Sequence, residues 1–120
     1  MTKPIFIYWL PVALWAILIF AVSGLPGEDL PYVFSGQDLF FHVMEYAVLA
    51  LLLNRALSRT SLKSYPQKKK LLLVIMACLI YAISDEFHQK FVPGRVASLA
   101  DILLDGLGIV IGGIAYRGRN

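Results

Sequence analysis

Four long apolar segments divide this chain and leave little sequence between them. A transmembrane helix needs about 20 mostly apolar residues to cross roughly 30 Å of hydrocarbon. We expect spans at about residues 5–22, 39–57, 71–91 and 97–116. The 120 residues are 58% apolar and 16% charged, and a soluble domain of this size could not cover four such segments. The sequence therefore predicts an all-α integral membrane bundle of four transmembrane helices, forming a single domain over residues 1–120. A cleaved signal peptide ending near Ser23 is the less favoured interpretation, because the first segment is long enough to span.

The basic residues between the segments predict how the bundle is oriented, because Lys and Arg mark the cytoplasmic loops. The loop between the second and third segments is basic and contains no acid, whereas the loop after the first segment has Glu28 and Asp29 and no basic residue. Both termini and the middle loop are therefore expected in the cytoplasm. The basic residues on that side are Lys3, Arg55, Arg59, Lys63, Lys68, Lys69, Lys70, Arg117 and Arg119. They flank apolar segments instead of forming one face, so a nucleic-acid partner is not expected.

Three of the expected helices each carry one polar stripe. At 100° per residue, side chains three or four positions apart share a helix face. Each stripe falls in the outer half of its segment, so the three predict one pocket that opens outward. The expected pocket residues are Asp38, His42, Glu45 and Tyr46 on the second segment, Asp85, Glu86 and Gln89 on the third, Arg95 in the loop, and Ser98, Asp101 and Asp105 on the fourth. Below them, Gly108 and Gly112 have the spacing that allows two helices to approach closely.

Acids outnumber bases in this expected pocket. An acid at the centre of a membrane helix is costly, so such residues normally face a bundle interior or a wet cavity. Crowded carboxylates in a low-dielectric site cannot all stay ionised without partners. Either they share protons or a divalent cation lies among them, with Asp85, Glu86, Asp101 and His42 as the candidate ligands. No other cofactor is indicated. Two interpretations of Arg95 remain open: a structural ion pair with a pocket acid, or capture of a ligand.

The run from Asp85 to Arg95, DEFHQKFVPGR, followed by Ser98, Asp101 and a glycine-rich helix, resembles the signature of the VanZ-like family. Ser23 with Pro26, and Asp38, His42 and Tyr46, match upstream. The sequence departs from the family pattern at Leu39, where lysine is common, and at Asp105, where asparagine is usual. Both departures make this pocket more acidic. The resemblance implies a multi-pass protein of the bacterial cytoplasmic (inner) membrane, in a family whose founding member is linked to resistance to the glycopeptide antibiotic teicoplanin.

Three functional hypotheses remain open at this stage. In the first, the outer pocket binds a polar ligand or cation and thereby affects sensitivity to glycopeptides. In the second, the protein is a membrane enzyme that acts on a lipid-linked headgroup. In the third, it is a proton-linked carrier, which would require oligomers because four helices are few for a carrier. The sequence identifies no catalytic residue, and the partners expected are membrane lipids and an unknown polar ligand at the outer face.

Overall fold

The computed structural model describes residues 5–26, 32–95 and 98–116. Within these residues the chain forms four helices and no strand: α1 (Phe6–Ser23), α2 (Gln37–Arg59), α3 (Gln67–Gln89) and α4 (Leu99–Ala115). The expected all-α class is confirmed. The third helix begins four residues earlier than expected, directly after Pro66, whose extended backbone ends the preceding loop. The residues on which the orientation partly depends, Lys3, Glu28, Asp29, Arg117 and Arg119, lie outside the described residues, as does Ala97, where the fourth span was expected to begin.

Three of the helices are long and apolar enough to cross a membrane: α1, α2 and α3. The fourth helix, α4, has 17 residues and is not one of them. The expected membrane character is therefore supported by three helices. The expected fourth span is not, because α4 is shorter than the apolar segment from which it was predicted.

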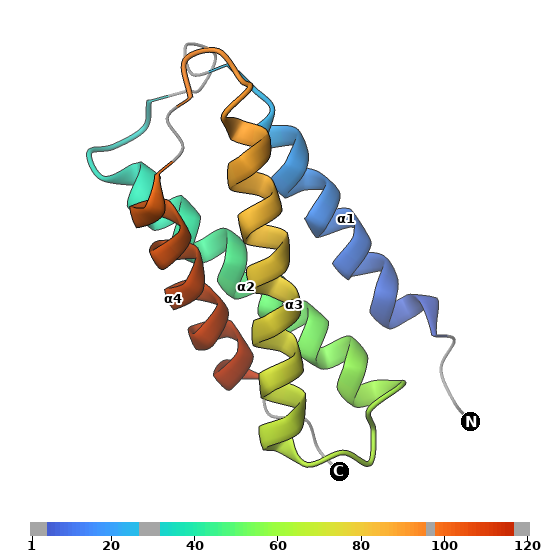
Figure 1. The fold of residues 1–120 in the computed structure, drawn as a ribbon. Coiled ribbons are helices and arrows are strands. Elements are labelled where there is room, and N and C mark those ends of the chain that lie inside the picture. The colour runs from blue at the N-terminus through green and yellow to red at the C-terminus, as the bar shows by residue number, and fades with distance from the viewer. Residues whose placement is uncertain (1–4, 27–31, 96–97, 117–120) are drawn as a thin grey trace.

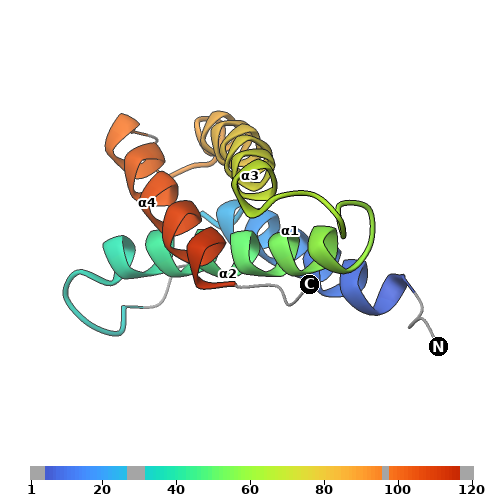
Figure 2. The same cartoon turned by 90° about the horizontal axis from the view of Figure 1, so that it is seen from below.

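The four helices form an elongated bundle of 48 × 25 × 25 Å (Figure 1). α2 contacts α1, α3 and α4, and its most extensive interface is with α4. Seen from below, α2 and α1 lie in one layer and α3 and α4 lie above α2 (Figure 2). A polar residue on the inner face of α2 can therefore meet side chains from each of the other helices.

The backbones of α2 and α4 come into direct contact at two glycines. A Cβ atom at Gly108 would overlap the carbonyl group of Val43, and one at Gly112 would overlap the carbonyl group of Ala47. Only a residue without a side chain fits at these positions, which is how small residues bring membrane helices together. This contact holds α4 against α2 just below the polar residues of both helices.

Lys70 is an unexpected member of the core. Lys68 and Lys69 are exposed, as expected of a cytoplasmic basic run, but Lys70 is fully buried. It begins the buried stripe of α3 that continues through Val74 and Cys78 at intervals of four residues. Its Nζ has no hydrogen-bond partner among the described residues. By charge, the three lysines are equivalent members of one basic run. Their positions along the helix differ, because only Lys70 lies on the same face as Val74 and Cys78.

Candidate functional site

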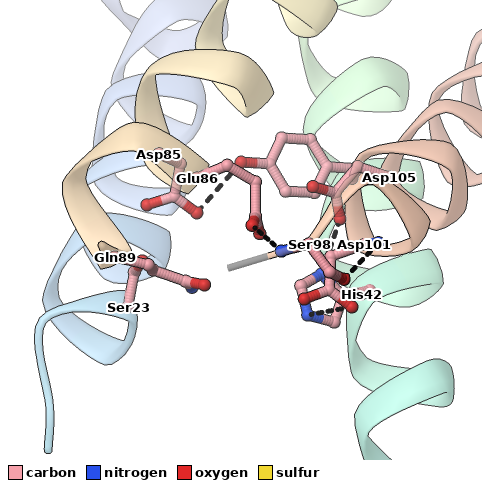
Figure 3. Close-up of polar contacts among 9 residues, drawn as sticks. Ser23, His42, Asp85, Glu86, Gln89, Ser98, Asp101 and Asp105 are labelled. Carbon is pink, nitrogen blue, oxygen red and sulfur yellow. Dashed lines mark hydrogen bonds and ion pairs between the residues drawn. The ribbon is translucent and has the colours of Figure 1, made fainter. Parts of the chain in front are cut away.

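His42 is the centre of the polar cluster between α2 and α4. Its Nδ1 lies 2.7 Å from Oδ1 of Asp105, and its Nε2 lies 3.8 Å from Oδ1 of Asp101 (Figure 3). The two aspartates are four residues apart on α4, so they share the face that meets α2. The side chain of Asp105 is 1% exposed, and that of Asp101 is 23% exposed. One imidazole thus bridges a buried carboxylate and one nearer the surface.

Glu86 connects α3 to the start of α4. Its Oε2 accepts a hydrogen bond from the backbone nitrogen of Ser98 at 3.0 Å. The hydroxyl of Ser98 accepts in turn from the backbone nitrogen of Asp101 at 3.2 Å, which makes Ser98 the N-cap of α4. Capping satisfies a helix-terminal N–H group that would otherwise lack a partner. These contacts fix the position of α4 so that Asp101 and Asp105 face His42.

The side chains of His42, Glu86 and Asp105 are arranged as metal ligands would be. One nitrogen or oxygen from each lies within 4.8 Å of the others. Glu86 and Asp105 are both buried, and His42 is partly buried. The candidate ligand set derived from the sequence was Asp85, Glu86, Asp101 and His42. The structural grouping keeps His42 and Glu86, includes Asp105, and leaves out Asp85 and Asp101.

Asp85 is turned toward a different partner. Its Oδ2 accepts a hydrogen bond from the hydroxyl of Tyr46 at 3.2 Å. Its Oδ1 is buried and has no hydrogen-bond partner among the described residues. In Figure 3 the carboxylates of Asp85 and Asp101 both point into the bundle, but only that of Asp101 approaches His42. The hydrogen bond between Tyr46 and Asp85 therefore joins α2 to α3 beside the cluster.

Ser23, Gln89 and Arg95 form a second polar group at the end of α1. The amide of Gln89 donates to the hydroxyl of Ser23 at 2.8 Å. With the amide rotated by half a turn, its oxygen accepts from Nη2 of Arg95 at 3.0 Å and its nitrogen donates to Glu86 at 3.3 Å. That orientation joins this group to the His42 cluster through Glu86.

Arg95 binds backbone carbonyls and makes no ion pair with a described acid. Its Nη1 donates to the carbonyl oxygens of Val22 at 3.4 Å and Leu25 at 3.3 Å. These carbonyls lie at the C-terminal end of α1 and two residues beyond it, where the helix dipole favours a cation. Of the two interpretations left open by the sequence, the structural ion pair with Asp85, Glu86 or Asp101 is not what the structure shows.

A cavity of about 370 Å³ lies beside this cluster, between the C-terminal part of α1 and the N-terminal part of α2. It contains five of the residues expected in the pocket: Asp38, His42, Glu45, Gln89 and Arg95. The other expected residues do not line it: Tyr46, Asp85, Glu86, Ser98, Asp101 and Asp105. The expected single pocket is thus a packed polar cluster and an adjoining cavity, and His42 belongs to both.

Sequence reasoning missed the apolar wall of this cavity. The Nε1 of Trp15 donates to the backbone oxygen of Glu45 at 2.8 Å, and Trp15 lines the cavity. Ser23 also lines the cavity and is 3% exposed. It matched the family pattern but was not placed in the pocket. The remaining wall consists of Leu18, Ile19, Val22, Leu25, Phe41 and Met44, with Gln37 at the mouth.

Three helices that are long and apolar enough to cross a membrane, together with buried ionisable residues, are typical of a membrane protein with an internal polar site. A family model described as VanZ/LLP1 matches residues 6–119. The chain belongs to this family, and the resemblance drawn from its motifs is confirmed. No curated protein and no solved structure matches the chain.

Proposed function

We propose that this member of the VanZ/LLP1 family is an envelope protein of the bacterial cytoplasmic membrane that binds a divalent cation at its outer face. The observation that carries the proposal is the convergence of His42, Glu86 and Asp105 from three different helices. Ligand atoms within 4.8 Å of one another can all reach one ion, because metal–ligand bonds of this kind are about 2.0–2.6 Å long.

The charges of the cluster also favour a cation. Three carboxylates, those of Glu86, Asp101 and Asp105, surround a single imidazole that carries at most one positive charge. A divalent ion would neutralise the remainder without requiring the acids to be protonated. A mixed set of carboxylates with one histidine suits Mn²⁺ or Zn²⁺ better than Ca²⁺ or Mg²⁺, which favour all-oxygen sites. The link to glycopeptide sensitivity rests on the family resemblance.

Adding Mn²⁺ or Zn²⁺ to the chelator-treated protein in detergent is expected to raise its melting temperature. A ligand that binds only the folded state stabilises it by about 2.7 kcal/mol at a free concentration 100 times Kd. The replacements Glu86→Gln and Asp105→Asn should each abolish the rise. Asp38→Asn is the matched control, because Asp38 lines the cavity but lies outside the ligand set. Melting that ignores every divalent ion but depends strongly on pH near neutrality would exclude the cation and favour shared protons.

We further propose that α4 also crosses the membrane, which gives four spans with both termini in the cytoplasm. Its 17 residues lie at the lower end of the length range for a span. It also runs beside α2 and α3, both of which are long and apolar enough to cross (Figure 1).

Reporter fusions test this topology directly. A reporter fused after Asn120, or inserted near Lys63, is expected to be cytoplasmic, because basic loops stay inside. A reporter inserted near Gly27 is expected to be external. If the reporters after Asn120 and near Lys63 lie on opposite sides, α4 does not span. If all three are inverted, the site faces the cytoplasm and the proposed outer location is wrong.

A further inference from the structure

We infer that the cavity between α1 and α2 binds a zwitterionic phospholipid, with the headgroup at its charged side chains and an acyl chain along its apolar wall. The inference goes beyond the proposed cation site and does not depend on it. It starts from the mixed lining of the cavity. Charged groups from α2 and the loop after α3 line it together with aliphatic and aromatic side chains of α1 and α2. A volume of about 370 Å³ is within the range of small-molecule sites.

The apolar wall opens toward the outside of the bundle. Leu18 is 47% exposed, Leu25 41% and Met44 38%, although all three line the cavity. α1 and α2 are both long and apolar enough to cross a membrane, so the medium beside these side chains is lipid. A ligand that enters there comes from the bilayer, and its apolar part can remain against Leu18 and Met44. A small water-soluble ligand would leave this wall without a partner.

The cavity wall carries both positive and negative side chains. Arg95 provides a guanidinium that already donates to two carbonyls and retains further N–H groups, because it has five. Glu45 and Asp38 provide carboxylates, and neither forms an ion pair with Arg95. The carboxylate of Glu45 accepts no hydrogen bond from any described residue. A guanidinium binds phosphate, and a carboxylate binds ammonium.

A headgroup that carries both a phosphate and an ammonium group would pair with Arg95 and with the carboxylates of Glu45 and Asp38 at the same time. An anionic headgroup would pair with Arg95 but would add negative charge beside Glu45 and Asp38. Like charges in a low-dielectric site are unfavourable. The charges on the cavity wall therefore select a zwitterionic lipid such as phosphatidylethanolamine over an anionic lipid such as phosphatidylglycerol.

Trp15 is a built-in reporter for this site. The chain has two tryptophans. Trp15 lines the cavity, whereas Trp9 donates to Thr60 at 3.0 Å at the other end of α1 and α2. The variant Trp9→Phe leaves Trp15 as the sole tryptophan, and Trp15→Phe leaves Trp9 as the matched reporter of bulk lipid.

The experiment measures quenching of each reporter by lipids with brominated acyl chains. Each protein is reconstituted into phosphatidylglycerol bilayers that contain a low mole fraction of brominated phosphatidylethanolamine or brominated phosphatidylglycerol. Trp15 is expected to be quenched more by the brominated phosphatidylethanolamine, and Trp9 equally by both. Equal quenching of Trp15 would overturn the inference. A preference for brominated phosphatidylglycerol would show an anionic-lipid site and would also overturn it.

Substitutions of the charged side chains identify the headgroup contacts. In the Trp9→Phe background, Glu45→Gln should weaken the preference for phosphatidylethanolamine by roughly tenfold, the effect of one lost charge-assisted contact. Arg95→Gln should weaken the quenching of Trp15 by both brominated lipids, because both headgroups carry a phosphate. Arg95→Lys retains the charge and should retain part of this quenching, which separates headgroup binding from misfolding. Asp101→Asn is the control, because Asp101 does not line the cavity. A preference that survives Glu45→Gln would overturn the ammonium contact, and quenching of Trp15 that is unchanged in Arg95→Gln would overturn the phosphate contact. Asp105→Asn should abolish the metal-dependent rise in melting temperature and leave the lipid preference intact, so that the two proposals can fail separately.

Discussion

Replacing Gly112 with alanine is expected to destabilise the bundle by about 3 kcal/mol or more, at the upper end of what overpacking costs. The added methyl group would overlap the carbonyl oxygen, carbonyl carbon and Cα of Ala47. All three are backbone atoms of α2, so no side-chain rotation can relieve the overlap. The two helices must move apart, and the contact between His42 and Asp105 must lengthen with them. The measurement is the free energy of unfolding in detergent, followed by circular dichroism.

Gly106→Ala is the matched control on the same helix. A Cβ atom there would meet only the Cδ2 of Leu79, at an ordinary 3.8 Å. Alanine is also the better helix former, by about 1 kcal/mol in an exposed helix interior. This variant should be as stable as the parent or more so. If Gly112→Ala unfolds at the same denaturant concentration as Gly106→Ala, the close contact between α2 and α4 does not exist.

The elements and their polar faces follow from local sequence patterns. Apolar runs of sufficient length predicted α1, α2 and α3, which are long and apolar enough to cross a membrane, because the hydrocarbon thickness fixes the length that is needed. The helical period grouped Asp101 with Asp105 and His42 with Tyr46, because side chains three or four residues apart share a face. These inferences use distances along one helix, for which the sequence is sufficient.

The partners across helices could not be read in the same way. Whether Asp85 or Asp105 reaches His42 depends on how α3 and α4 are rotated and shifted against α2. The backbone contacts at Gly108 and Gly112 determine how α4 is rotated and shifted against α2. The spacing of the glycines does not reveal which helix they contact. The contact of Arg95 with the carbonyls of Val22 and Leu25 likewise depends on a loop returning to the end of α1. Charge complementarity left an acid or a captured ligand as its partner, because the sequence does not reveal which backbone carbonyls a distant side chain reaches.

The second large effect is expected at the pair formed by His42 and Asp105. In the chelator-treated protein, His42→Leu leaves the carboxylate of Asp105, 1% exposed, without its 2.7 Å partner. Removing one member of a buried charged pair costs about 3–5 kcal/mol, because the other charge remains buried and unpaired. Asp105→Val should cost less, because His42 still has Asp101 at 3.8 Å and is itself more exposed.

The double variant His42→Leu/Asp105→Val decides whether the two side chains act as a pair. Two apolar residues can replace a buried pair with little loss of stability, so the double variant should be more stable than His42→Leu alone. The coupling energy is obtained from unfolding measurements on the parent, the two single variants and the double variant. Strictly additive costs would mean that Asp105 does not depend on His42. The cluster would then lack the side-chain contact that joins α2 and α4 around the proposed ion.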